Sequence, residues 1–148
     1  MNKAKALKLA EFLETKVKPS WFSMNSWATE GFKEKKCGSV ACAIGWATVA
    51  FPRSSLFLTG LSGSSEYQIA YKDREGSVFY KNDAIDKFFN LNPNEGDFSF
   101  IFSPLSWEKL PTPKQVAKRI RQYIENPKKV EELAISRQLL RAGRNKHV

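Results

Sequence analysis

Two cysteines, Cys37 and Cys42, are the residues of this sequence best suited to nucleophilic chemistry. Cys37 precedes an uncharged segment, and the start of a helix lowers the pKa of a thiol. A cysteine hydrolase also needs a base, usually histidine, and the only histidine is His147, next to the last residue. Chain ends are often poorly ordered. We therefore expect no catalytic residue and interpret Cys42 as a small buried side chain.

Metal ligands and paired carboxylates are equally sparse. Two thiols without a nearby histidine fall short of the four ligands of a zinc site. Asp83 and Asp86 stand near a predicted helix start, as do Glu95 and Asp97, and carboxylates are favoured there without any catalysis. The segment 90–98 lacks the acidic spacing of a calcium loop. We expect neither a metal nor a cofactor.

A phosphate site is suggested just before the uncharged segment. Free backbone N–H groups, a glycine, a hydroxyl and two ammonium groups suit an anion, and the chain supplies them at Lys35, Lys36, Gly38 and Ser39. The Walker A spacing is absent, so this is not a P-loop. In the alternative interpretation, Gly38 only permits a tight turn into a crowded core.

Positive charge is concentrated at the C-terminal end. The net charge is +9, and residues 112–148 contribute 10 basic and 3 acidic side chains, against 14 and 12 in residues 1–111. A cationic end on a nearly neutral body suits a polyanion such as nucleic acid, although a solvated helix face has the same composition. The candidate contacts are Arg137, Arg141 and Arg144.

One β-hairpin is expected over about 66–81. Tyr67, Ile69 and Tyr71 alternate with more polar residues, and Val78 and Tyr80 continue the pattern after a four-residue turn that ends at Gly76. Aromatic side chains on a two-stranded ribbon can stack on bases, so Tyr67 and Tyr71 are candidate ligand-binding residues.

A buried central helix is predicted over about 39–51, because this segment has no charge and small residues on both faces. Ser39 is a candidate N-cap for it. Segment 20–36 is expected to be a loop pinned by aromatic residues, and 53–65 a loop with an apolar patch at 56–58. Further helices are predicted over 3–16, 83–90, 93–104, 113–125 and 127–142, the last with Val130, Leu133 and Ala134 facing inward.

The length and composition predict a single α+β domain over 1–148, mainly helical, with a basic helical pair at 112–142. The chain has 148 residues, of which 42% are hydrophobic and 13% aromatic, and this supports one core. No apolar run is long enough to span a bilayer, and the start of the chain lacks a signal-peptide pattern, so we expect a cytoplasmic protein without membrane contact.

Three segments match short motifs of one family. Residues 37–47, CGSVACAIGWA, are similar to C-G-S/T-x-A-C-A-x-G-W-A. Residues 88–91 and 100–102 resemble F-F-G-L…L-F, with Asn90 where glycine is usual, and 112–120 resembles T-P-x-x-V-A-x-R-I. These motifs belong to small uncharacterised proteins of phages and bacteria. The resemblance implies one intact domain of phage or mobile-element origin, acting in the host cytoplasm, and implies no particular chemistry.

Together these features favour a non-enzymatic accessory protein that binds a phosphate-bearing partner. That partner is either nucleic acid or a signalling nucleotide, which the protein would sequester as a counter-defence. One alternative is a protein–protein interaction module that inhibits a host protein through exposed apolar residues, and a third is an unrecognised hydrolase. A homo-oligomer is compatible with the sequence.

Overall fold

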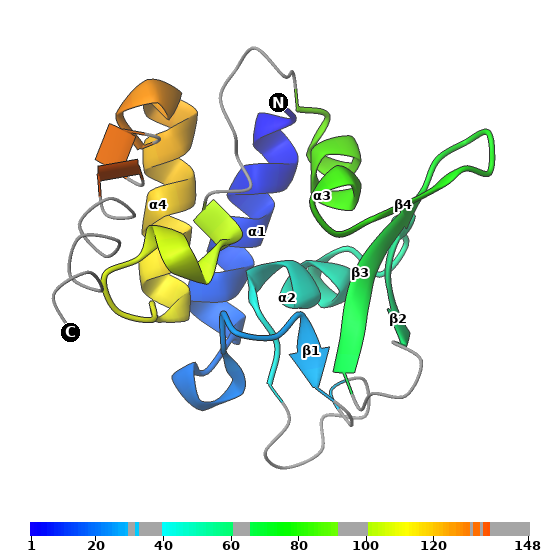
Figure 1. Ribbon diagram of the computed structural model, residues 1–148, viewed down its shortest axis with the longest axis horizontal. Helices are drawn as coiled ribbons and strands as arrows, with labels where there is room; N and C mark the ends of the chain where they lie inside the picture. The colour runs from blue at the N-terminus through cyan, green and yellow to red at the C-terminus, as the bar shows by residue number, and fades with distance from the viewer. Residues whose placement is uncertain are drawn as a thin grey trace, which may run out of the picture.

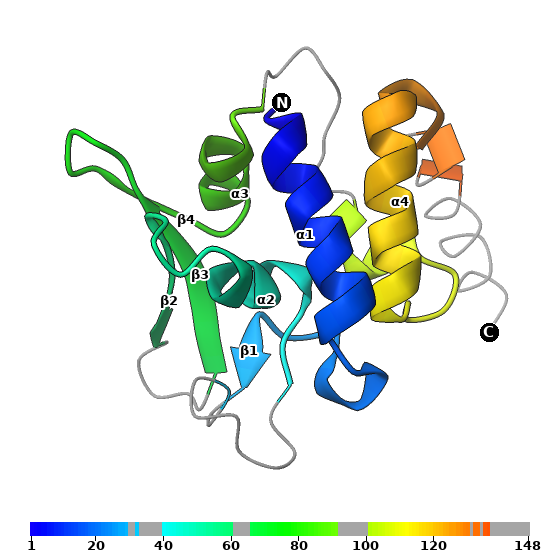
Figure 2. The same ribbon diagram turned by 180° about the vertical axis from the view of Figure 1, so that it is seen from behind.

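A four-stranded antiparallel sheet stands at one side of the molecule, with helices layered beside it (Figure 1). The computed structural model describes residues 1–29, 32, 40–60, 66–91, 101–130, 132–133 and 135–136, apart from the side chains of Glu66 and Leu105. Helices α2 (Ala43–Ala50) and α3 (Lys81–Phe89) lie next to the sheet. Helices α1 (Lys3–Lys16) and α4 (Pro113–Glu125) lie side by side beyond them (Figure 2). The predicted α+β architecture is confirmed.

Helix α1 follows its sequence pattern. The Asn2 side chain accepts a hydrogen bond from the Lys5 backbone N–H at 3.1 Å and so caps the first turn. Its buried residues are Ala6, Leu9, Ala10 and Leu13, which share one helical face.

Strand β3 (Glu66–Lys72) is the centre of the sheet. Strand β2 (Leu56–Gly60) pairs with it along one side, and β1 (Ala28–Thr29) and β4 (Val78–Tyr80) pair with it elsewhere along its length. The β3–β4 hairpin confirms the sequence prediction, with Gly76 at φ 92°. Its loop covers 73–77, because Lys72 pairs with Val78, and is thus one residue longer than predicted.

The segment predicted as a loop over 53–65 contains a strand, which corrects that prediction. Leu56 and Leu58 are buried on the core side of β2, and only Phe57 between them is exposed, at 39%. The apolar patch expected at 56–58 is therefore mostly core. A strand of alternating burial explains these residues better than a loop, because every second side chain faces the helices.

Helix α2 starts later than predicted, at Ala43, with Cys42 in the N-cap position. The preceding residue, Ala41, is held extended because its backbone N–H donates to the Trp21 carbonyl at 3.2 Å and it forms bridges to Phe22 and Ala28. The predicted cap, Ser39, lies outside the described residues. Segment 20–29 is an aromatic-rich connection that begins within the 3₁₀ turn η1 (Pro19–Trp21), as expected, but it ends in strand β1 (Ala28–Thr29), which was not predicted.

Helix α3 runs two residues further upstream than predicted and ends as predicted at Asn90, whose φ is 51°. Most of the helix predicted over 93–104 lies outside the described residues. Its described end consists of a 3₁₀ turn at 101–102 and then η3 (Pro104–Ser106).

Helix α4 starts with the predicted signal. Thr112 accepts from the Gln115 backbone N–H at 3.3 Å, and the Gln115 side chain accepts from the Thr112 N–H at 2.8 Å, which completes a capping box. Residues 127–130, 132–133 and 135–136 are helical beyond it. Val130 is buried there as predicted, but Leu133 is 47% exposed, so its inward placement was wrong.

None of the helices that the structure describes is both long enough and apolar enough to span a membrane.

Candidate functional site

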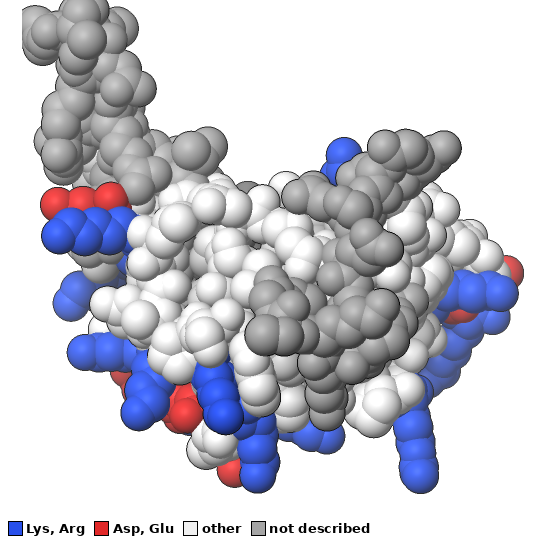
Figure 3. All heavy atoms as spheres, turned by 90° about the horizontal axis from the view of Figure 1, so that it is seen from below, with Lys and Arg blue, Asp and Glu red and all other residues white. Residues whose placement is uncertain are grey.

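The outer side of α4 presents several basic side chains to solvent. Lys114 and Lys118 are exposed one helical turn apart, and Lys128 and Lys129 are exposed just beyond the helix. In Figure 3, Lys and Arg side chains with a few Asp and Glu among them line the margin of the molecule on the side that carries α4, and further Lys and Arg lie on the opposite side. The buried face of α4 fixes this orientation, since Val116, Ala117 and Ile120 are fully buried.

An open depression of about 530 Å³ adjoins this side of α4. Among the described residues that line it, Lys109, Lys118 and Arg119 are basic and Glu108 alone is acidic. Gln115 and Gln122 add two amides, and Leu110 and Trp107 add apolar surface. Three cations against one carboxylate give this depression a net positive character.

Arg119 is the most ordered cation of the depression. Its guanidinium carbon lies 3.2 Å from the centre of the Trp107 ring, so the two planes are in contact. Its Nη1 donates to the Ser106 carbonyl oxygen at 3.0 Å. The Trp107 indole N–H in turn donates to the Ile101 carbonyl at 3.1 Å. A guanidinium held this way loses little conformational entropy when it binds a ligand.

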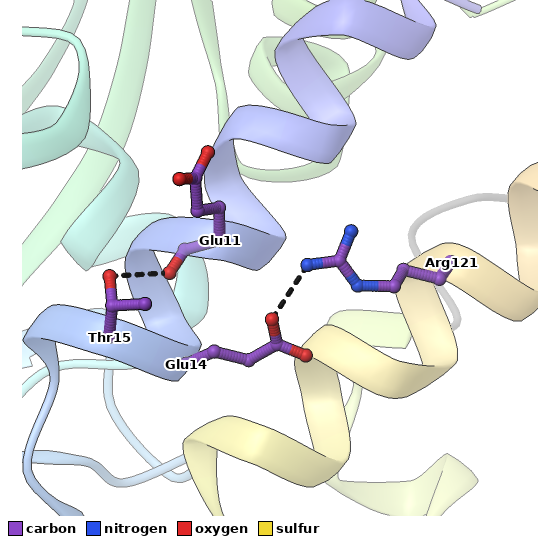
Figure 4. Close-up of polar contacts among 4 residues, drawn as sticks. All are labelled: Glu11, Glu14, Thr15 and Arg121. Atoms are coloured by element: carbon purple, nitrogen blue, oxygen red, sulfur yellow. Dashed lines mark hydrogen bonds and ion pairs between the residues drawn. The ribbon is translucent and has the colours of Figure 1, made fainter.

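Arg121 points away from this depression, toward α1. Its guanidinium forms a 2.6 Å ion pair with Glu14, which raises the pKa of Arg121, and the pair ties α4 to α1 (Figure 4). Arg121 therefore has a structural partner, unlike the exposed lysines of α4, which are better placed to meet a ligand.

The remaining chemistry of the described residues argues against thiol catalysis at Cys42. This thiol is buried, and desolvation raises its pKa to about 11, so it is uncharged at neutral pH. The interpretation of Cys42 as a buried apolar side chain is confirmed. Among the residues that the structure describes, no group of acidic, histidine or cysteine side chains is arranged to hold a metal ion.

Of the nine site residues predicted from sequence, Tyr67 and Tyr71 belong to the described part of the chain. Tyr67 and Tyr71 are partly buried and pack against the core, and the Tyr71 ring lies 6.4 Å from that of Phe88. Their inner ring faces are thus engaged with protein, which leaves less ring surface for a base. The seven others lie outside the described residues: Lys35, Lys36, Gly38, Ser39, Arg137, Arg141 and Arg144.

Sequence reasoning missed the depression itself. Lys118 belongs to the basic C-terminal third that composition indicated, but Trp107 and Arg119 are twelve positions apart in different elements. No local spacing joins such residues, so only the return of the chain from η3 into α4 brings them together.

Comparison with family models, with curated proteins and with solved structures gave no significant match for this chain.

Proposed function

We propose that this protein binds single-stranded nucleic acid, without catalysis, through the outer side of α4 and the depression beside it. The observation that carries the proposal is the Arg119 guanidinium, which lies over the Trp107 ring at 3.2 Å from its centre. Single strands are recognised by bases stacked on aromatic rings or arginine planes together with a basic groove for the backbone.

Each part of the site has a role in this proposal. Trp107 is only 7% exposed, so the outer face of Arg119 rather than the indole offers the stacking plane. Lys109 and Lys118 flank it and neutralise phosphates. The Gln122 amide and the Gln115 NH2 group, whose carbonyl oxygen already caps α4, supply hydrogen bonds to base edges. Exposed lysines beyond α4 extend the basic path.

The test is fluorescence anisotropy of a labelled 12-nucleotide single strand at several salt concentrations. We expect the affinity to fall steeply with salt, and Lys118→Gln to reduce the slope of log affinity against log salt by about 0.7, the value for one lost phosphate contact on a single strand. Arg119→Lys keeps the charge but removes the plane, so binding should weaken roughly tenfold, as for the loss of one stacked base.

The matched control is Arg74→Gln, which removes one cation from the exposed tip of the β3–β4 hairpin. It changes the net charge as Lys118→Gln does, so any effect common to both reflects overall charge. Equal weakening by the two variants, or binding that ignores salt, would contradict the proposal.

A further inference from the structure

Strand β3 has one edge that is only partly occupied. Strand β2 pairs with one side of β3 from Tyr67 to Tyr71, so β1 and β4 must share the other side. There, Ala28 of β1 pairs with Tyr67, and Tyr80 of β4 pairs with Ala70. The two strands thus end short of each other, and no strand of the described residues lies beside the edge of β3 at positions 68 and 69.

A cavity of about 400 Å³ lies at this break in the sheet. Trp27, which precedes β1, and Lys81, which follows β4, both line it, as does Gln68 of β3. In an antiparallel register these residues are the next ones past each strand end, so the divergence of β1 and β4 itself creates the space. Cavities of this volume accommodate small organic ligands.

The cavity wall combines polar groups with an apolar surface. Among the residues that the structure describes, its lining includes one ammonium group, from Lys81, and no carboxylate. Asn25, Gln68 and Asn82 contribute amides, and Ser103 contributes a hydroxyl. Its apolar members include Met24, Trp27 and Phe102. Such a wall suits a ligand with a negative group at one end and a flat, polar-edged ring at the other.

The first residues of α3 line this cavity, and the helix begins with a left-handed residue and without a side-chain cap. Lys81 has φ 52°, a left-handed conformation that is uncommon outside glycine and tends to occur at ligand sites. No side chain from the N-cap residue, Tyr80, bonds the first turn of α3. First-turn N–H groups without a cap are ready donors for an anion, and Lys81 and Asn82 of this turn line the cavity. Asp83, also in the first turn, is not among the lining residues.

A second feature of the wall also calls for a partner. The Ser26 Oγ is buried and has no hydrogen-bond partner among the described residues. Buried hydroxyls are nearly always bonded to protein or to an ordered water molecule. This feature is independent of the α3 terminus, since Ser26 belongs to the segment before β1.

The wall around Ser26 is held firmly by α2. The Cys42 backbone N–H donates to the carbonyl oxygens of Ser26 at 3.0 Å and Trp27 at 3.3 Å. A side chain on Gly45 would collide with the Trp27 carbonyl oxygen, so α2 and this segment are in direct backbone contact. A site built on fixed backbone is pre-organised for a ligand.

We propose that this cavity binds a small phosphate ester with a planar ring, of the size of a nucleoside monophosphate. The phosphate lies at the start of α3 beside Lys81, the ring lies against Trp27, and the amides of Gln68 and Asn82 bond the ring edge. The inference does not rest on the proposed nucleic-acid surface, because the cavity and the depression beside α4 share no lining residue.

The experiment is isothermal titration calorimetry of the full chain with the four common ribonucleoside monophosphates, their nucleosides and inorganic phosphate. We expect at least one monophosphate to bind with a stoichiometry of one, and its nucleoside to bind at least tenfold more weakly. Equal binding of nucleoside and monophosphate, or no binding heat from any monophosphate at millimolar concentration, would overturn the proposal.

Lys81→Gly separates loss of the site from loss of the fold. Glycine accepts a φ of 52° without strain, so this variant should melt no lower than the parent protein, yet it should bind the monophosphate at least tenfold more weakly. Gln68→Ala should weaken binding several-fold, and Arg74→Gln, at the hairpin tip, should leave it unchanged.

The same variants distinguish this site from the α4 surface. Lys81→Gly should still bind the labelled 12-nucleotide strand, and Lys118→Gln should still bind the monophosphate. Monophosphate affinity that survives Lys81→Gly, or that falls with Lys118→Gln instead, would refute the assignment of the cavity whatever the outcome for the single strand.

Discussion

Gly45→Ala tests whether α2 and the segment before β1 depend on direct backbone contact. The new methyl group would overlap the Trp27 carbonyl oxygen and lie 2.8 Å from the Ala41 Cβ. Neither neighbour can move aside easily, because the Trp27 carbonyl also accepts a hydrogen bond from the Cys42 N–H and Ala41 is fully buried. The protein must therefore separate the helix from this segment to accommodate one carbon atom.

The expected change in the free energy of unfolding is the sum of two opposing effects. Alanine is favoured over glycine inside a helix by about 1 kcal/mol. Overpacking of a rigid site costs about 1–3 kcal/mol, and a clash with backbone belongs at the upper end of that range. We expect a net loss of about 2 kcal/mol in the free energy of unfolding, which for a domain of this size lowers Tm by roughly 4–8 °C.

The assay is urea denaturation followed by tryptophan fluorescence, with Tm from calorimetry. The matched control is Gly60→Ala, because a Cβ at Gly60 meets nothing within 4 Å. It should change the stability by less than about 0.5 kcal/mol, as a surface substitution does. If Gly45→Ala were as stable as the parent, or if both variants lost the same stability, the close backbone approach would not be the reason for glycine at position 45.

Three further predictions follow from single contacts. Because burial raises the pKa of Cys42 to about 11, the unfolded chain releases this proton first, so stability should fall between pH 9 and 11. Between pH 8 and pH 10.5, the free energy of unfolding should fall by on the order of 1 kcal/mol less in Cys42→Ala than in the parent protein, as measured by denaturation at both pH values. An equal fall in the two proteins would contradict the raised pKa of Cys42. Thr112→Ala should cost about 1 kcal/mol in urea denaturation, since it removes half of a capping box, and a neutral result would show that the cap is dispensable. A double-mutant cycle on Glu14 and Arg121 should give a coupling of only about 0.5 kcal/mol, lost in 1 M salt, because both side chains are about one-third exposed, at 33% and 39%.

The conspicuous motif of residues 37–47 has a structural explanation over its described part. The Cys42 N–H donates to the carbonyl groups of Ser26 and Trp27, Gly45 leaves room for the Trp27 carbonyl, and the Trp46 indole N–H donates to the Trp21 carbonyl at 3.1 Å. The Trp46 ring also meets the Phe32 ring edge-on at 4.8 Å. Cys42 and Gly45 thus help to position the wall of the cavity at Ser26 and Trp27.

The sequence by itself determined the local elements of this protein. The amphipathic pattern and the caps at Asn2 and Thr112 fixed the starts of α1 and α4, and Gly76 and Asn90 marked the hairpin turn and the end of α3. These signals are readable because the hydrogen bonds and backbone preferences that produce them act within a few residues along the chain.

Only the tertiary structure decided which distant residues meet. Strand β2 was missed because its pairing with β3, rather than any local preference of a segment rich in serine and glycine, makes it a strand. The stack of Arg119 on Trp107 and the cavity between Trp27 and Lys81 likewise join separate elements. Their positions depend on how the sheet edge is shared and how the helices stack, and contacts between such distant residues leave no periodicity in the sequence.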